Sequence, residues 1–437
     1  MSDNDLQENL NRRKLLRNLG IAAVSAGSAA MVLNKPVAAQ SSTCAFRNVK
    51  DYGAVGDGVT DDSASIQMAI DSLPVSGPVS DNPFLGSGGT VLFPAGVYRV
   101  ADTIRVARNN VSLIGAGPDA TVLLADAALP AVVRFGDATA GDSGLAINCS
   151  IEQMSVDRRT GTVPIGSVGI LWELFAYGYE RHTRVNRHYY GRKITGIGPP
   201  NRISIQYSLY EPYSSNAMRA HMCIEYAAGI KVFGGEFGRN GGEEFDSVGM
   251  IEITGLANDV TFAQCSFLPR GPATITGNGN KPGVILINGL TISTGVFKFI
   301  DCNTEATSVG FSSDAATPRI DDIHVVGGRW AMETTMFNFH PNTKIVAMWL
   351  TGVAMASSVI LVNSQWLVMS GCTMGNSAFH GGADADMTIT GNRFQGSVLL
   401  QGDFRGLMFT GNVHNGLTDA TSVNNHVLVT NNLQSSI

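Results

Sequence analysis

The clearest pattern of hydrophobic and polar positions lies near the C-terminus, where four short segments repeat at a fixed period. The segments begin at Leu367, Met387, Leu407 and Val427, so they lie 20 residues apart. Each carries large apolar residues two positions apart, followed by Ser or Thr and then by Gly or Asn. This alternation predicts a strand with one buried face, and the Gly or Asn predicts a turn after it.

The turn position of this repeat can be followed backward along the chain. Its members are spaced by 30, 37, 26, 25, 19, 20, 20 and 20 residues, namely Gly234, Gln264, Asp301, Gly327, Gly352, Gly371, Gly391, Gly411 and Asn431. A chain that returns to one turn position about every 20 residues is typical of a solenoid coil rather than a meander. We therefore expect an all-β, single-stranded parallel β-helix with regular coils over about residues 228–433.

One side-chain column follows the turn position. Asn392, Asn412 and Asn432 come one residue after it, where their amides can bond one another along the stack. Three cysteines take the same position in earlier coils, namely Cys265, Cys302 and Cys372. We interpret them as small buried fillers, with a disulfide between stacked coils as the alternative.

The N-terminal part predicts a cap for the solenoid over about residues 46–75. Apolar residues at Ile66, Ala69, Ile70 and Leu73 have helical spacing, and Thr60 or Asp61 can cap the helix that they define. A solenoid needs an atypical end that covers its exposed core. The helix is well placed to be that end.

Length and composition agree with one elongated domain over residues 40–437. A chain of 437 residues would ordinarily suggest about three domains. Only 15% of its residues are charged, and it contains 50 glycines, as stacked strands and tight turns require. Cysteines are too sparse for a disulfide scaffold, and none forms a Cys-x-x-Cys pair.

Residues 1–39 have the features of an export signal. Basic residues from Arg12 to Arg17 precede an uncharged stretch over 19–34, and small residues precede Gln40. The paired arginines resemble the twin-arginine motif, and a general secretory signal is the alternative. We therefore expect a periplasmic or secreted protein. Its mature part has 25 Lys and Arg against 33 Asp and Glu, which disfavours nucleic acid as a partner, and no membrane partner is expected after the signal is removed.

The stretches 49–71, 89–98 and 114–117 together resemble the opening of the pectate-lyase superfamily domain. The superfamily contains polysaccharide lyases, polygalacturonase-type glycosidases, uronan epimerases and phage tailspikes. The resemblance implies a right-handed β-helix and a polysaccharide substrate, and the tailspikes make a homotrimer an expectation. It fixes no reaction. The Gly-His-Gly and Arg-Ile-Lys motifs of the glycosidases and the Trp-x-Asp-His motif of calcium-dependent lyases are missing.

Residues 171–227 interrupt the repeat and predict a loop-rich insert. Aromatic rings suit sugar rings and guanidinium groups suit carboxylates, so we expect substrate binding there, with packing against the rod or a neighbouring subunit as the alternative. The predicted substrate-binding residues are Trp172, Tyr177, Tyr179, Arg184, Arg187, Tyr207 and Tyr210, together with Arg239 in the following coil.

Two clusters are candidates for catalysis, because glycosidic hydrolysis needs two carboxylates on one face. The first comprises Glu236, Glu243, Glu244 and Asp246. In the second, Asp322 and His324 lie on one side of a strand, where a carboxylate can orient an imidazole. Both clusters have the alternative of being solvated surface.

The sequence therefore predicts an exported enzyme that cleaves a polysaccharide, preferably by hydrolysis. A lyase, a uronan epimerase and a non-catalytic carbohydrate-binding rod are the alternatives. No cofactor is expected. The sequence contains no compact loop of alternating acidic ligands by which a calcium site could be recognised. Calcium binding therefore stays open.

Overall fold

The computed structural model describes residues 46–74, 88–126, 129–196, 204–238, 249–268, 283–288, 294–355, 359–361, 364–381, 384–421 and 427–434. The chain separates into two units, Met1–Cys44 and Ala45–Ile437. The predicted export signal lies outside the described residues. Among the helices that are described, none is long and apolar enough to cross a membrane.

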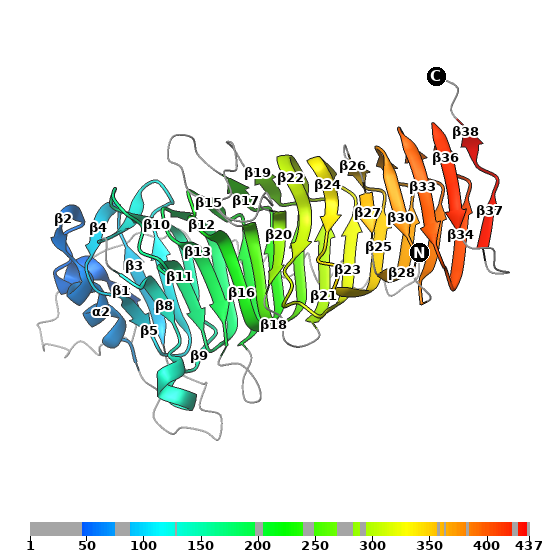
Figure 1. Ribbon diagram of the computed structural model, residues 1–437. Coiled ribbons are helices and arrows are strands. Elements are labelled where there is room, and N and C mark those ends of the chain that lie inside the picture. The colour runs from blue at the N-terminus through cyan, green and yellow to red at the C-terminus, as the bar shows by residue number, and fades with distance from the viewer. Residues whose placement is uncertain are drawn as a thin grey trace, which may run out of the picture. The chain divides into compact units, whose positions relative to one another are not determined.

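The unit Ala45–Ile437 is a rod of parallel strands that coil around one interior (Figure 1). Each coil contributes to three sheet faces, which we call sheets A, B and C in the order in which the chain crosses them. Several strands bend at a turn and contribute to two of these faces. The prediction of a parallel β-helix is confirmed.

Sheet A is the longest of the three faces. It comprises β1 (Phe46–Asn48), β3 (Gly89–Phe93), β6 (Val111–Gly115), β9 (Ala146–Ile147), β10 (Ser150–Arg158), β12 (Phe175–Asn186), β14 (Ser204–Tyr210), β16 (Ala220–Phe233), β18 (Gly249–Ala263), β21 (Thr294–Ile300), β23 (Arg319–Val326), β25 (Lys344–Thr351), β28 (Ser364–Ser370), β31 (Asp386–Thr390), β34 (Gly406–Thr410) and β37 (Val427–Thr430).

Sheet B follows the turn position. It comprises β2 (Asp57–Asp61), β4 (Gly96–Val100), β7 (Thr121–Ala125), the ends of β10 and β12, β15 (Tyr213–Ser215), β17 (Glu236–Gly238), β19 (Ser266–Leu268), the starts of β22 (Asn303–Ser313) and β24 (Arg329–Asn338), β26 (Ala354–Met355), β29 (Thr373–Met374), β32 (Arg393–Phe394), β35 (Val413–His414) and β38 (Leu433–Gln434).

Sheet C closes each coil. It comprises β5 (Ile104–Val106), β8 (Ala131–Phe135), β11 (Val168–Glu173), β13 (Tyr190–Thr195), the starts of β16 and β18, β20 (Gly283–Asn288) and the ends of β22 and β24. A separate four-stranded ladder contains β27 (Val359–Leu361), β30 (Ser377–His380), β33 (Ser397–Gly402) and β36 (Gly416–Thr421).

The repeated turn has one backbone conformation. All nine predicted turn residues have φ between 50° and 66°, the left-handed region that glycine adopts freely and other residues enter uncommonly. The column also continues backward through Glu211, His182 and Gln153, which have φ of 50°, 48° and 57°. These three coils do not show the glycine pattern of the later turns, because their turn residues are long and polar.

The predicted insert over residues 171–227 is wrong. Strands β11 to β16 of this stretch pair in parallel register with their neighbours, like the coils that follow them. Charged and aromatic residues in this stretch suggested solvent-exposed loops. Several of them instead point into the rod, including Glu180, Arg192 and Trp172.

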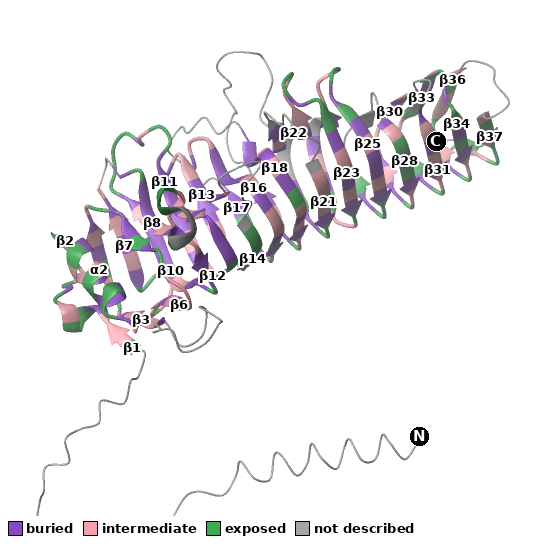
Figure 2. Ribbon diagram, turned by 90° about the horizontal axis from the view of Figure 1, so that it is seen from below, coloured by how far each residue is buried: buried purple, intermediate pink, exposed green. Residues whose placement is uncertain are grey.

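Apolar stacks and amide hydrogen bonds fill the interior. Buried residues occur in strands along the rod (Figure 2). Phe262 stacks on Phe299 with ring centroids 5.5 Å apart. The Asn412 Nδ2 donates to the Asn432 Oδ1, and the Asn392 Nδ2 donates to the Asn412 Oδ1 at 3.1 Å. Cys265, Cys302 and Cys372 are buried free thiols, as small fillers would be.

The N-terminal end is covered by α2 (Ser63–Asp71) and the 3-10 helix η1 (Val49–Tyr52). Asp62, not Thr60 or Asp61, is the N-cap residue of α2. Its buried carboxylate accepts the N–H groups of Val55 and Gly56, while Asp61 accepts the N–H of Ser63. These carboxylates shape the loop and the cap.

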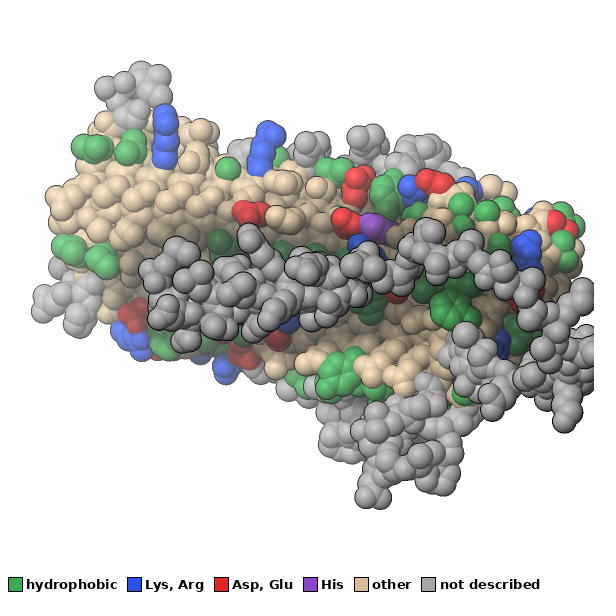
Figure 3. Space-filling model, turned by 180° about the vertical axis from the view of Figure 1, so that it is seen from behind, with side chains coloured by type: hydrophobic (Ala, Val, Ile, Leu, Met, Phe, Trp, Pro, Cys, Tyr) green, Lys and Arg blue, Asp and Glu red, His purple; other side chains and the backbone are tan. Residues whose placement is uncertain are grey.

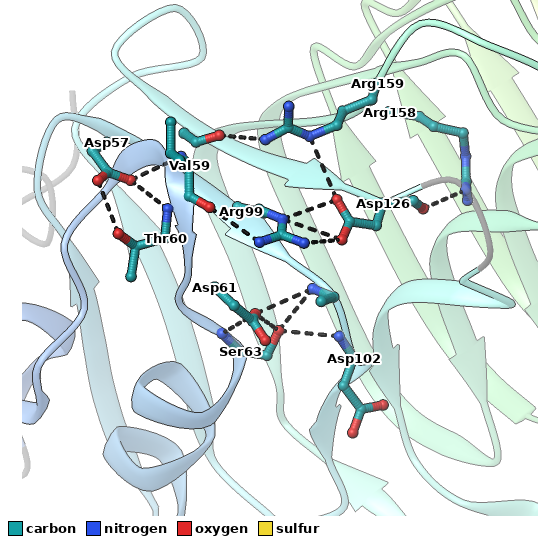
Figure 4. Close-up of polar contacts among 12 residues, drawn as sticks. Asp57, Val59, Thr60, Asp61, Ser63, Arg99, Asp102, Asp126, Arg158 and Arg159 are labelled. Carbon is teal, nitrogen blue, oxygen red and sulfur yellow. Dashed lines mark hydrogen bonds and ion pairs between the residues drawn. The ribbon is translucent and has the colours of Figure 1, made fainter.

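Ion pairs tie the cap to the first coils (Figure 4). The Arg99 guanidinium lies 2.7 Å from the Asp126 carboxylate and donates to the Val59 carbonyl. Arg159 lies 3.4 Å from the same carboxylate. The polar side chains of this end are thus engaged in structural contacts. A second 3-10 helix, η2 (Ala138–Gly144), lies between β8 and β9.

Candidate functional site

Two predicted substrate-binding residues are core residues instead. Trp172 and Tyr207 are 0% exposed, so neither ring can stack on a sugar. The Trp172 indole N–H and the Tyr207 hydroxyl both donate to Oε1 of Glu180, at 2.8 and 2.5 Å. Their prediction as substrate contacts is wrong, because a buried carboxylate recruits both as hydrogen-bond donors.

Glu180 is the centre of a charged network inside the rod. Its Oε2 accepts from the Thr183 hydroxyl at 2.8 Å and from Arg192 Nε at 3.0 Å. Glu180 and Arg192 are both 0% exposed. A buried charge requires a partner and several hydrogen bonds, and here β12 supplies the acid and β13 supplies the base.

The remaining predicted binding residues of this stretch lie on or near the surface. Tyr177 is 51% exposed, and Tyr179 and Tyr210 place their ring centroids 5.6 Å apart. Arg184 pairs with Asp119, and the Arg187 Nε lies 3.6 Å from the Asp157 carboxylate. Exposure leaves their predicted role in binding untested.

Glu236 and Asp322, the described carboxylates of the two predicted catalytic clusters, lie in different parts of the rod. Glu236 is exposed on β17, next to buried Phe237. Asp322 and His324 lie on the outer side of β23 in sheet A, three coils further along and on the other side of the turn. His324 stacks on Trp349 at 4.3 Å, and burial lowers its pKa. Four other predicted residues lie outside the described residues, namely Arg239, Glu243, Glu244 and Asp246.

A denser group of ionisable side chains lies on the outer side of sheet C, and we call it the sheet C cluster. It comprises Tyr190, Lys193, Arg219, Glu225 and Glu252. The parallel register places Lys193, Cys223 and Glu252 at one position on three successive coils. Ile194 and Ile224 on one side, and Ile251 and Ile253 on the other, are buried, so the polar side chains between them point outward.

Two linked ion pairs organise the sheet C cluster. The Lys193 ammonium lies 2.9 Å from Glu225, which also accepts from the Thr195 hydroxyl at 3.1 Å. Arg219 contacts both oxygens of Glu252, at 2.6 and 3.1 Å, and the Tyr190 hydroxyl donates to Glu252 at 3.1 Å. The Lys193, Arg219 and Glu225 side chains are 24–28% exposed, which leaves them accessible to a ligand.

The surroundings fix the protonation states in this cluster. Burial, Cys223 and Glu252 raise the pKa of the Tyr190 phenol well above its ordinary value. Burial lowers the pKa of Lys193, but the hydrogen bond to Glu225 and the charges of Cys223, Glu225 and Glu252 together raise it above its ordinary value. Burial also raises the pKa of the Cys223 thiol. The cluster therefore offers a protonated phenol, an ammonium paired with Glu225 and a guanidinium paired with Glu252, and Cys223 is no nucleophile.

This group could have been found in the sequence. A charged residue stands directly beside a buried apolar one in each of the segments Lys193-Ile194, Ile224-Glu225 and Ile251-Glu252. Aligning them needs the register of sheet C, whereas the turn column gives only the register of sheets A and B. On the face shown in Figure 3, by contrast, charged side chains form a few small groups on a mostly uncharged surface.

The fold is that of a pectate lyase-like, right-handed parallel β-helix. Residues 46–180 match the family described as rhamnogalacturonase A/epimerase, pectate lyase-like. The A-module of mannuronan C-5 epimerase AlgE6 from Azotobacter vinelandii has a similar fold, with a TM-score of 0.56, 16% identity, and coverage of 90% of this chain and 100% of that one.

Two curated proteins share a shorter segment with the chain. Mannuronan C5-epimerase AlgE1 of Azotobacter vinelandii is 45% identical over 82 residues, 17% of this chain and 5% of that protein. A glucan 1,3-beta-glucosidase of Cochliobolus carbonum is 40% identical over 87 residues, 20% of this chain and 11% of that protein. The chain therefore spans a small part of either relative, and its similarity to them is confined to that segment.

Proposed function

We propose that the protein acts on a uronate-containing polysaccharide by removing the proton at C5 of a uronate unit. The observation that carries this proposal is the convergence of Lys193, Tyr190 and Glu225 on one accessible face of sheet C. A uronate C5 proton becomes acidic only when the adjacent carboxylate is neutralised. An ammonium ion can neutralise the carboxylate, and a base beside it can remove the proton.

Each residue then has a defined role. Lys193 neutralises the substrate carboxylate, and the ionised Glu225 takes the C5 proton while the electron pair of the C–H bond moves into the carboxylate as an enolate. Tyr190 keeps its proton, because burial and Glu252 raise its pKa, and so can donate it. Arg219 and Glu252 position the phenol through their bidentate contact.

The enolate has two outcomes that conserve all atoms. Reprotonation of C5 from the opposite face gives the C5 epimer. Expulsion of the C4 oxygen, protonated as it leaves, gives a 4,5-unsaturated unit and a cleaved chain. Both share the first step, and the similarity to mannuronan epimerases makes mannuronan the first substrate to test.

Hydrolysis is the second candidate. Glu225 stands two residues beyond Cys223, the register partner of Glu252 on the adjacent coil, so the cluster holds two carboxyl groups, as glycosidases require. Hydrolysis needs one of them as a proton donor, however, and each is engaged in an ion pair, with Lys193 or with Arg219. The proton-abstraction mechanism therefore fits the cluster better.

The test is incubation of mature protein with mannuronan and polygalacturonate in D₂O. The proposal predicts deuterium at C5 where the enolate is reprotonated, or the ultraviolet absorbance of 4,5-unsaturated products where the C4 oxygen leaves, because elimination leaves no hydrogen at C5. It predicts that Lys193→Gln abolishes either signal. Lys231→Gln is the matched control, because Lys231 is exposed on sheet A of the same strand β16 that carries Glu225. New reducing ends without deuterium or unsaturation would instead indicate hydrolysis.

Export and assembly complete the proposal. An exported protein would meet extracellular polyuronates directly, so the proposed substrate agrees with the predicted periplasmic or secreted location. The homotrimer stays a prediction.

A further inference from the structure

A cavity of about 390 Å³ lies beside the turn between sheets A and B, a different edge of the coil from the sheet C cluster. Its lining residues are Pro118, Gln153, His182, Thr183, Arg184, Glu211 and Tyr213. Small-ligand sites usually have volumes of about 300–1,000 Å³. The cavity therefore has the size of a binding site.

Three consecutive coils build one wall of this cavity from the turn column. In later coils the same turn position is often glycine, as at Gly234 and Gly327, but here it holds Gln153, His182 and Glu211 in the left-handed region. Such a conformation is uncommon for long side chains. Backbone strain of this kind often accompanies functional sites, and it projects all three side chains to one side of the rod.

The wall is an ordered chain of hydrogen bonds. The Gln153 amide nitrogen lies 2.7 Å from Nδ1 of His182 and can only donate to it. The Nε2 of His182 therefore carries the proton and points to the Glu211 carboxylate, which it contacts. This arrangement leaves Glu211 with a second oxygen that can accept from a ligand.

Two further lining residues, Arg184 and Tyr213, place a guanidinium against an aromatic ring. The Arg184 guanidinium lies 5.0 Å from the centroid of the Tyr213 ring and pairs with Asp119. Glu236 is the register partner of Tyr213 on the next coil and is exposed beside it. Fixed donors and acceptors next to an aromatic ring are suited to a sugar, whose hydroxyl groups bond the polar atoms and whose C–H face covers the ring.

The charge of the cavity selects the kind of sugar. The lining contributes one guanidinium, that of Arg184, which already pairs with Asp119, and one carboxylate, that of Glu211. A uronate would have to compete with Asp119 for the guanidinium beside Glu211, whereas the hydroxyl groups of a neutral sugar would meet the hydrogen-bonding groups of Gln153, His182 and Glu211. We infer that this cavity is a binding site for a neutral sugar unit, separate from the uronate chemistry of sheet C.

The test follows the His182 ring by NMR in the full mature chain, with its signals assigned by loss in His182→Gln. The probes are laminaritriose, maltotriose and galactobiose as neutral sugars, and trimannuronate as the acidic comparison. The inference predicts saturable shifts of the His182 signals with at least one neutral probe and none with trimannuronate. It also predicts that Glu211→Gln and Tyr213→Ala weaken that binding tenfold or more.

Lys193→Gln is the control for independence, because it alters only the sheet C cluster. Its His182 titration should match that of the unaltered protein whether or not uronate activity is found. Failure of all three neutral probes to shift His182, or tighter binding of trimannuronate than of any of them, would overturn the inference. Glu211→Gln changes a half-exposed side chain and is expected to fold, and unchanged binding by it would count equally against the site.

Discussion

Removing the guanidinium of Arg192 tests whether the buried network holds the central coils together. The change Arg192→Met keeps most of the side-chain volume and deletes three hydrogen bonds. These are the bonds from Nε to Glu180 at 3.0 Å, from Nη2 to the Thr183 hydroxyl at 2.8 Å and from Nη2 to the Thr183 carbonyl at 3.1 Å. The carboxylate of Glu180 then stays buried with neutral donors alone.

The expected loss of stability is large. Breaking a buried ion pair by removing one partner costs about 3–5 kcal/mol, because the other charge stays desolvated. The double change Glu180→Gln with Arg192→Met removes both charges, and the coupling of contacting residues is about 0.5–3 kcal/mol. The double variant should therefore be more stable than Arg192→Met alone.

The assay is equilibrium unfolding in urea, followed by circular dichroism. Arg393→Met on β32 is the matched control, because Arg393 is exposed and such surface changes usually stay within about 0.5 kcal/mol. If Arg192→Met lost no more stability than Arg393→Met, or if the double variant were the least stable of the three, the network would not have the role given to it here.

Three further predictions address the core and the surface. Burial, reinforced by Arg192, lowers the pKa of His221 to about 3. Between about pH 6.5 and 3 the unfolded chain therefore binds a proton that the folded chain does not. The free energy of unfolding falls by about 1.4 kcal/mol for each unit by which the pH is lowered in this range. Urea midpoints at pH 7 and pH 5 should show this fall and a smaller one for His221→Gln; equal falls in both proteins would contradict it. Asn412→Ala leaves the Asn392 N–H and the Ile389 carbonyl without their partners at 2.9 Å. This should lower the free energy of unfolding by about 2–4 kcal/mol, against less than about 1 kcal/mol for the exposed Asn415→Ala. Similar urea midpoints for the two variants would refute the amide ladder. Tyr207→Phe deletes a donor to buried Glu180 and should cost about 1–3 kcal/mol, whereas Tyr177→Ala on the surface should leave the thermal midpoint nearly unchanged, and the reverse ranking would be evidence against the assignment of Tyr207 to the core.

The solenoid was predictable because its repeat is local. The turn at Gly371, Gly391 and Gly411 must return to the left-handed region in each coil, and glycine records that requirement directly in the sequence. Where Gln153, His182 and Glu211 satisfy the same turn, the record is lost and the coils were mistaken for an insert. Backbone conformation, not residue type, defines the column.

The candidate site was less predictable for a related reason. Alternation along one strand correctly places Glu236 and Asp322 on the outside, yet exposure alone does not bring side chains together. Lys193, Glu225 and Glu252 meet only through the register of sheet C, across coils of unequal length. Conversely, Trp172 is a residue type that often stacks on sugars, but here its indole N–H donates a hydrogen bond to the carboxylate of Glu180 inside the rod.

The most direct test of the proposed function is deuterium incorporation at C5 of mannuronan and polygalacturonate in D₂O, measured for the unaltered protein, Lys193→Gln, Tyr190→Phe and Lys231→Gln. Losing the ammonium that neutralises the substrate carboxylate, or the phenol that donates a proton, should each slow incorporation by about 10²-fold or more. Lys231→Gln should match the unaltered protein. Incorporation that is equally fast in Lys193→Gln would contradict the assignment of proton abstraction to the sheet C cluster. The absence of both deuterium incorporation and unsaturated products on both polymers would contradict it as well.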